Sequence, residues 1–225
     1  MRILFLGDLH GNWPATLAME EAIRGLDADD IWFLGDAVGK GPSSDLTCDW
    51  VRAHCRHWIG GNWDYGVGGR EFSEDGFFWD QLGEERLSWL RGLPPEDELT
   101  FSGLRFRLFH GRPLTPLLMA DSPREEFEAV LVTDWGRFDG AIFADSHRAF
   151  VRTLNGAYVC NAGSVGNNLG VPRAHALLLE DRPLRMTILS VPYDNEAAAE
   201  DARKAKVLLH CDAYIREVLT GVYSR

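Results

Sequence analysis

The segment Ile3-Leu4-Phe5-Leu6-Gly7-Asp8-Leu9-His10 joins a short apolar run to two residues that can bind a metal. Four consecutive apolar residues before a glycine are typical of a buried strand that ends at a turn. We predict a strand over 2–7. Asp8 and His10 are two residues apart, and on an extended backbone such side chains point to the same face, so they could hold one ion together. Taken alone, Asp-x-His is weakly specific, and a solvated loop is the commoner explanation.

Four further apolar runs end in the same way, each at an Asp, an Asn or a His. The residues that follow these runs are Asp36, Asn62, His110 and His147. The carboxyl ends of neighbouring strands meet at one edge of a sheet, so the pattern predicts a single crevice with several polar ligands. Each residue also has an ordinary structural explanation, because Asp36 could cap a turn, Asn62 could bond its own loop and His110 could lie hydrogen-bonded in the core.

The composition favours one folded domain over residues 1–225. The chain is 45% hydrophobic, contains eight Trp and carries a formal charge of −11. Proteins that bind nucleic acid through its phosphates use clustered Lys and Arg, so nucleic acid is not an expected partner. No apolar stretch has the length of a membrane span, and we expect no membrane partner. The four cysteines show no Cys-x-x-Cys pair, which favours the cytoplasm.

The first part of the chain alternates strands with helices. The pattern predicts a helix over 14–25, a strand over 30–35, a helix over 43–56 and a strand over 57–60. This βαβαβ order indicates a mainly parallel sheet. Asn12 can cap the first helix, and Pro14 lies at an early helical position where its missing N–H costs nothing.

Residues 65–95 differ in character from the rest. Glycines at 66, 68 and 69 precede the aromatic cluster Phe77-Phe78-Trp79, and a short helix then leads to Leu93. We interpret the segment as an insertion or a lid. Its aromatic residues could stack a nucleobase over the site, but packing of the lid or of a subunit interface in a homo-oligomer is the commoner fate of such clusters.

From about residue 97 the sequence predicts hairpins and then helices. The turns are Ser102-Gly103, Asn155-Gly156 and Asp181-Arg182-Pro183, and we expect the strands around them to form a second, mixed or antiparallel sheet. Residues 194–222 favour one or two closing helices that begin at Asp194 or Asn195 and use apolar residues such as Val207.

Together, these blocks resemble in order and spacing the signature of the calcineurin-like metallophosphoesterases. The matching motifs are Asp8-x-His10, Gly35-Asp36, Gly61-Asn62-x-Asp64, His110-Gly111 and Ser146-His147. Residues 161–166 and 191–194 also resemble blocks of the family's small bacterial phosphodiesterase branch. The resemblance covers nearly the whole chain, and it implies an α/β fold, a four-layer αββα sandwich with two mixed β-sheets.

The resemblance also implies two divalent metal ions, each held by four residues. The first set is Asp8, His10, Asp36 and His147, and the second is Asp36, Asn62, His110 and the residue at 145. Asp36 would bridge the ions. In such a centre the ions share a hydroxide that attacks phosphorus in line, while they stabilise the charge on the phosphoryl oxygens. Asp36, Asn62 and His110 would then be the catalytic ligands.

At residue 145 the chain departs from the family pattern. The family usually has Gly-His-Thr-His where this chain has Ala144-Asp145-Ser146-His147. A carboxylate there favours Mn or Fe, with Zn, Ni or Mg as alternatives. If Asp145 is a ligand, the +4 of two divalent ions is balanced by the −4 of Asp8, Asp36, Asp145 and the hydroxide. A neutral centre disfavours dianionic monoesters and favours diesters or nucleotide-like phosphoanhydrides. The alternative is that Asp145 does not bind metal and leaves one weakened site.

Trp63 is the second departure, because many family members have a His there that protonates the leaving oxygen. The indole N–H is not an acid at working pH, so we predict dependence on good leaving groups. Candidate substrate contacts are Trp63, Asn12 and Arg148. Helix capping explains Asn12 at least as well, and pairing with a surface carboxylate is an equal alternative for Arg148.

We therefore expect a metal-dependent phosphoesterase that acts on a small phosphodiester or nucleotide-like phosphoanhydride. One alternative is a phosphomonoesterase, including a phosphoprotein phosphatase. Another is a non-catalytic scaffold that keeps the fold to bind a partner. Convergent carboxylates argue against the scaffold, because without metal they repel one another.

Overall fold

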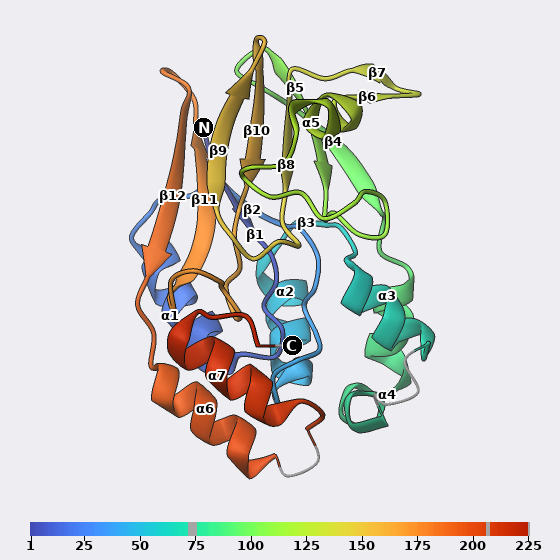
Figure 1. Ribbon diagram of the computed structural model, residues 1–225, viewed down its shortest axis with the longest axis vertical. Coiled ribbons are helices and arrows are strands. Elements are labelled where there is room, and N and C mark those ends of the chain that lie inside the picture. The colour runs from blue at the N-terminus through green and yellow to red at the C-terminus, as the bar shows by residue number, and fades with distance from the viewer. Residues whose placement is uncertain (72–75, 206–207, 225) are drawn as a thin grey trace.

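Two five-stranded sheets packed face to face form the centre of the molecule (Figure 1). The computed structural model describes residues 1–71, 76–205 and 208–224. The first sheet has the order β12-β11-β1-β2-β3 and the second the order β4-β5-β8-β10-β9. A core cluster that includes Phe5, Leu34, Phe106 and Ile142 fills the space between them.

The first sheet confirms the predicted βαβαβ unit. Its members are β1 (Arg2–Leu6), α1 (Trp13–Arg24), β2 (Asp30–Phe33), α2 (Ser44–His54) and β3 (His57–Trp58). β1 is parallel to β2, and β2 is parallel to β3, so their carboxyl ends lie at one edge. Asn12 caps α1 by accepting a hydrogen bond from the N–H of Ala15 at 3.1 Å.

The predicted hairpins are confirmed, but one of them belongs to a different sheet from the one expected. β4 (Glu96–Phe101) and β5 (Leu104–Phe109), like β9 (Phe150–Leu154) and β10 (Ala157–Asn161), lie in the second sheet together with β8 (Gly140–Phe143). β11 (Ala174–Glu180) and β12 (Arg185–Val191) instead extend the first sheet, because β11 pairs antiparallel with β1. Turn residues predict a hairpin but carry no information on its partner strand.

The helices cover the outer faces of the two sheets. α1, α2 and α6 (Asn195–Lys204) supply buried residues to the core outside the first sheet. Residues of α5 (Arg124–Val130), such as Phe127, cover the outside of the second sheet. The sequence pattern did not predict α5 or the short β6 (Val132–Thr133) and β7 (Gly136–Arg137). The layers are those of an αββα sandwich.

The segment interpreted as an insertion or lid contributes two helices to the core. α3 (Asn62–Gly69) buries Val67, and α4 (Gly76–Arg91) buries Phe78, Leu82, Leu87 and Leu90. Phe77 and Trp79 pack against the same cluster. Residues 72–75 of the predicted segment lie outside the described residues. A lid role for it stays a prediction.

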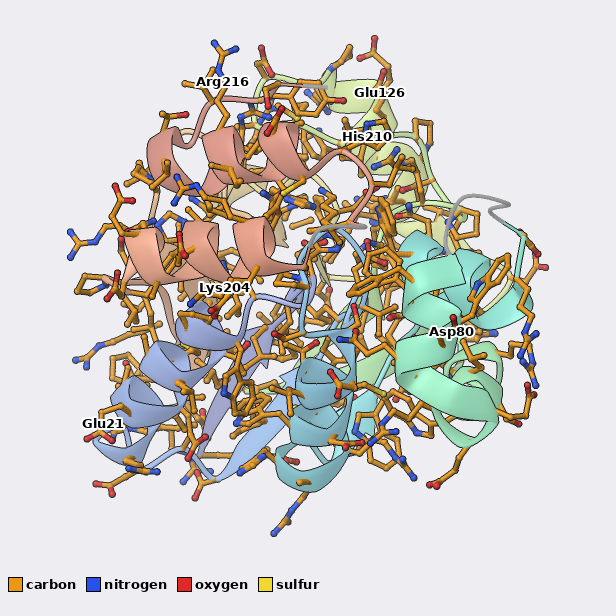
Figure 2. All side chains as sticks on the ribbon, turned by 90° about the horizontal axis from the view of Figure 1, so that it is seen from below. Glu21, Asp80, Glu126, Lys204, His210 and Arg216 are labelled. Carbon is orange, nitrogen blue, oxygen red and sulfur yellow. The ribbon has the colours of Figure 1, made fainter. Side chains whose placement is uncertain are left out.

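Two helices close the chain, as predicted. α6 begins after Asp194, which caps it by accepting a hydrogen bond from the N–H of Ala197 at 2.9 Å. α7 (Cys211–Thr220) runs beside α6, and α6 packs on α1 (Figure 2). Val207, one of the residues behind this prediction, lies outside the described residues. Among the described residues, none of the helices combines the length and the apolar character needed to traverse a lipid bilayer.

Candidate metal centre

The candidate ligands lie on loops just beyond strand ends, in an unusual backbone conformation. Five of them have positive φ angles: Asp8 (53°), His10 (47°), Asp36 (61°), Asp145 (65°) and His147 (57°). Residues other than glycine rarely adopt this left-handed region, and those that do cluster at functional sites. β1 ends at Leu6. The expectation that Asp8 and His10 share a face of an extended strand is therefore wrong, because the left-handed loop brings them together.

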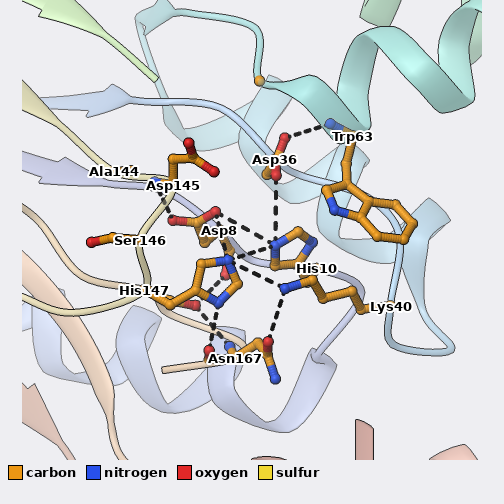
Figure 3. Close-up of polar contacts among 12 residues, drawn as sticks. Asp8, His10, Asp36, Lys40, Trp63, Ala144, Asp145, Ser146, His147 and Asn167 are labelled. Atoms are coloured by element: carbon orange, nitrogen blue, oxygen red, sulfur yellow. Dashed lines mark hydrogen bonds and ion pairs between the residues drawn. The ribbon is translucent and has the colours of Figure 1, made fainter. Parts of the chain in front are cut away.

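The structure brings the predicted carboxylates and imidazoles into one buried cluster (Figure 3). Nε2 of His10 lies 3.5 Å from Oδ1 of Asp8 and 3.6 Å from Oδ2 of Asp36. Nε2 of His147 lies 3.2 Å from Oδ1 of Asp8. Nε2 of His110 lies 3.3 Å from Oδ2 of Asp36 and 3.8 Å from Oδ1 of Asp8. Both aspartates therefore stand between histidines from different loops.

Backbone carbonyls orient all three imidazoles. Nδ1 of His10 lies 3.0 Å from the carbonyl oxygen of Val38, Nδ1 of His110 lies 2.6 Å from that of Leu34, and Nδ1 of His147 lies 2.6 Å from that of Asn167. A carbonyl only accepts, so Nδ1 is the donor in each ring. Each Nε2 then faces the cluster, the orientation found in metal-binding histidines.

The residues fit divalent metal ions. Oδ1 of Asp8, Oδ1 of Asn62 and Nε2 of His110 are buried and have no hydrogen-bond partner among the described residues. Buried polar atoms are nearly always partnered, so these three atoms are suited to face a cation. The ligand atoms form two groups, and within each group all atoms lie within 4.8 Å of one another. One group comes from Asp8, His10 and His147, and the other from Asp8, Asp36 and His110.

Charges within the cluster lower the pKa of the Asp8 carboxyl and raise the pKa of the His110 imidazole. Burial alone would raise the pKa of Asp8, but His147, His10 and His110 hold it well below its usual value. Burial alone would lower the pKa of His110, yet the carboxylates of Asp36, Asp8 and Asp145 hold it well above its usual value. The pKa of His10 falls to about 4 because of burial and the nearby Lys40. In this arrangement, a proton on His110 balances carboxylates that a metal would otherwise neutralise.

Asp64 supports the loops that carry Asp36 and Asn62, although the sequence motif alone did not indicate this role. Its buried carboxylate accepts hydrogen bonds from the N–H groups of Asp36, Ala37 and Gly61, at 2.7, 2.9 and 3.0 Å. Burial and the charge of Asp36 raise the pKa of Asp64 to about 7. Its place in the Gly-Asn-x-Asp block was the available sequence signal.

Asp145 lies beside the cluster, but its carboxylate is bound by an arginine. Nε and Nη2 of the Arg112 side chain donate to the two carboxylate oxygens of Asp145 at 2.6 to 3.1 Å. The backbone N–H of Arg112 also donates to Oδ2 of Asp145 at 3.0 Å. Oδ1 of Asp145 lies 3.9 Å from Nε2 of His110. The predicted charge count treated Asp145 as an uncompensated negative charge. Arg112 compensates it, so the preference for diesters loses that basis.

The predicted substrate contacts have different surroundings. Asn12 is buried, with its amide oxygen on Ala15 and its amide nitrogen donating to the carbonyl of Gly166 at 2.7 Å, which supports the capping alternative. Trp63 donates its backbone N–H to Oδ1 of Asp36 at 2.9 Å, and its ring meets His10 edge-on at 5.8 Å. Arg148 lines a cleft next to His147.

A series of hydrogen bonds connects Glu217 on α7 to His147 through Asn167. Oε2 of Glu217, a buried residue, accepts a hydrogen bond from the Asn167 amide at 3.1 Å. The side-chain oxygen of Asn167 accepts one from Nζ of Lys40 at 3.0 Å, and its backbone carbonyl holds His147. Sequence reasoning missed these residues, because a glutamate in a helix and an asparagine in a loop have no distinctive pattern.

Comparison with known proteins agrees with this geometry. The sequence model of the calcineurin-like phosphoesterase family matches residues 1–168 of this chain. The chain belongs to this family. An uncharacterized protein of Methanocaldococcus jannaschii, MJ0912, is 27% identical over 232 residues, which cover 91% of this chain and 93% of that protein. Family members act on phosphoesters with divalent metals, and the donor set described above is of that kind.

Two solved structures show the same fold over nearly their full lengths. A metallophosphoesterase from Sphaerobacter thermophilus has a TM-score of 0.79 and 24% identity, with 99% of this chain and 100% of that chain covered. The hypothetical protein PH1004 from Pyrococcus horikoshii OT3 has a TM-score of 0.82 and 19% identity, with 99% of each chain covered. These similarities confirm the predicted sandwich.

Proposed function

We propose that the protein hydrolyses phosphodiester or nucleotide-like phosphoanhydride bonds with two divalent metal ions. The observation that carries the proposal is the set of buried polar atoms without partners, on Asp8, Asn62 and His110, of which Asp8 and His110 lie within the cluster of imidazoles and carboxylates. A protein that only binds a partner gains nothing from buried carboxylates that repel one another. Manganese or iron is the proposed metal pair, because carboxylate, imidazole and amide donors suit both.

Each proposed ion has its own ligands, and Asp36 reaches both sets. Its Oδ2 lies near Nε2 of His10 and near Nε2 of His110. When bound, the ions would supply Lewis acidity, which lowers the pKa of a water and offsets charge on phosphoryl oxygens. Asp8, His10 and His147 would hold one ion, and Asn62 and His110 the other. We propose that Asp145 holds Arg112 in place and is not itself a ligand.

The protein residues position these groups and supply charge. The backbone N–H of Trp63 and the carboxylate of Asp64 fix Asp36 from two sides. Trp63 supplies no acid for a leaving group, so aryl diesters should react much faster than alkyl diesters. The cytoplasm stays the proposed location, in keeping with four unpaired cysteines.

The proposal is tested by metal analysis together with a hydrolysis screen. The wild-type protein should hold two ions of manganese or iron per chain and hydrolyse aryl diesters or dinucleoside polyphosphates. Asp36→Asn should lose at least one ion and at least 10²-fold in kcat/KM, because it touches both ligand sets. Asp80→Asn, an exposed change on α4, is the matched control and should alter neither (Figure 2).

The alternatives make different predictions in the same screen. A phosphomonoesterase would prefer aryl monoesters to diesters. A scaffold would contain no metal and hydrolyse nothing, and that result would refute the proposed function.

A further inference from the structure

A cleft of about 290 Å³ opens directly beside the metal ligands. Its lining includes Asp145 and His147 together with Lys40, Arg112 and Arg148. These three cations come from separate loops, after β2, β5 and β8. The chain as a whole carries a formal charge of −11, so three positively charged side chains around one cleft form a local exception to its net negative charge. Such a cleft raises the local concentration of anions.

The surrounding residues fix the cations in different ways. The Arg112 guanidinium is held by its two-point pairing with Asp145, which uses Nε and Nη2, while its Nη1 has no hydrogen-bond partner among the described residues. Nζ of Lys40 lies 3.0 Å from the Asn167 side chain and 3.3 Å from Nε2 of His147. Within the described ranges, the side chain of Arg148 has no hydrogen bond or ion pair. Arg112 and Arg148 therefore retain donors for a ligand.

We propose that this cleft is a second anion subsite, which binds the non-reacting phosphate of a phosphoanhydride substrate. This inference rests on the proposed function and narrows it, because a simple diester has one phosphate and needs no second subsite. Three cations and one carboxylate leave a net positive charge next to the reaction centre, which suits an additional phosphate group. Arginine forks match phosphate oxygens in geometry as well as in charge.

The chemistry of the leaving group supports the same substrate class. Hydrolysis would form one bond between the water oxygen and the reacting phosphorus, and would break the bond to the bridging oxygen. The bridging oxygen and its electron pair leave on the phosphate held in the cleft, one water proton stays on the new phosphate and the other passes to solvent. A leaving phosphate is stable without a proton, so this reaction does not need the acid that Trp63 fails to provide.

Binding measurements on the metal-loaded protein test the subsite without relying on turnover. The probes are methylenediphosphonate, which carries two phosphonate groups and cannot be hydrolysed, and methylphosphonate, which carries one. In Arg148→Gln, the Kd for methylenediphosphonate should rise about tenfold, because a charge-assisted contact is lost, while the Kd for methylphosphonate should change less than about twofold. Isothermal titration gives both values, and metal content measured after each titration excludes removal of the ions by the probe.

Two further variants complete the design. Arg112→Lys keeps the charge but loses the two-point pairing with Asp145, so it should also weaken methylenediphosphonate selectively. Arg185→Gln removes the same charge at the start of β12, opposite Glu180 and hence at the far end of the first sheet, and should change neither Kd. Thermal midpoints within about 2 °C of wild type show that a variant is folded.

The outcomes separate this inference from the proposed function. If both probes bound more weakly to the same extent, or if Arg148→Gln and Arg112→Lys left both Kd values unchanged, the second subsite would be refuted. This holds even if the wild type hydrolyses diesters. Selective weakening would support the subsite even if no hydrolysis were detected, and in that case the proposed function alone would fail.

Discussion

At the residue scale, Asp64 shows how a side chain outside the ligand set can control its geometry. Its carboxylate accepts three backbone N–H groups, from Asp36, Ala37 and Gly61. These bonds hold Asp36 in the left-handed conformation at φ 61° that directs it into the cluster. Such a conformation persists only where the surroundings determine it.

Asp64→Asn should therefore weaken metal binding. The amide keeps one acceptor oxygen, but its NH₂ group would face backbone N–H donors and leave at least one of them unpartnered. We expect the Kd for Mn²⁺ to rise at least tenfold and stability to fall by about 2 kcal/mol. Titration of the metal-free protein and urea unfolding measure the two effects. The exposed Asp121→Asn is the control, and unchanged Mn²⁺ affinity in Asp64→Asn would contradict the positioning role.

Several ligands could be predicted from the sequence, but their exact surroundings could not. Asp8, His10, Asp36, His110 and His147 lie together as expected, but they follow strands of two sheets, β1 and β2 in the first and β5 and β8 in the second, whose carboxyl ends meet at one end of the sandwich. Lys40 and Arg112 approach the cluster through loops whose conformation depends on tertiary contacts. The pairing of Arg112 with Asp145 in particular has no local sequence signal, since the two residues are 33 positions apart.

At the scale of elements, α7 is tied to the site through Glu217. Replacing this buried side chain with alanine would leave the Asn167 amide and the N–H of Ser224 without their acceptor. Glu217→Ala should lower the free energy of unfolding by about 2–4 kcal/mol and weaken metal binding several-fold through His147. Urea denaturation and metal titration measure this.

The matched control is Glu200→Ala on α6. Glu200 makes ion pairs with Arg203 and Lys204 on the same helix, so the cost should stay below about 1 kcal/mol. If Glu217→Ala lost stability but kept wild-type metal affinity, α7 would be a structural helix without influence on the site.

α4 provides a second test at this scale, because the sequence suggested a lid and the structure buries the helix. Leu87 is 0% exposed, whereas Leu46 on α2 is 41% exposed. Leu87→Ala should cost about 2–5 kcal/mol, and Leu46→Ala less than about 1 kcal/mol. Chemical denaturation distinguishes them. Equal, small costs would indicate that α4 detaches readily, as a lid does.

The elements themselves were largely predictable, with the exceptions explained by packing. Alternating apolar runs and the turns Ser102-Gly103 and Asn155-Gly156 are local signals, and the strands follow them closely. Whether β11 joins the first or the second sheet is decided by long-range burial of both its faces, which local patterns do not encode. α5 is short, and its amphipathic pattern is too brief to distinguish it from a loop.

At the scale of the whole molecule, the stability of the metal-free protein should depend on pH, and metal binding should reduce this dependence. In the metal-free protein the folded-state pKa values of Asp64, about 7, and of His110, well above 6.5, exceed their unfolded values. The folded state then binds more protons, so these groups stabilise it most at low pH. The contribution of Asp64 declines as pH rises from about 4 to about 7, and that of His110 declines as pH rises above 6.5.

We expect the thermal midpoint of chelator-treated protein to fall as pH rises from about 6.5 into the alkaline range, and to fall less after manganese is added. His10, with its pKa lowered to about 4, acts only below this window. His110→Gln, which cannot bind the proton, should reduce the slope in the metal-free protein. A flat profile in the metal-free wild type would contradict the proposed charge balance of the cluster.

The site also unites distant parts of the chain. Nε2 of His10 and Nε2 of His147 are 3.2 Å apart, yet 137 positions separate the two residues, and Glu217 lies still further along. During synthesis, a nascent chain leaving the ribosome would expose its first ligands long before the last ones exist. The proposed ions could therefore be held by the full set of ligands only after His147 has been synthesised, and a product that ends before it would lack part of the site.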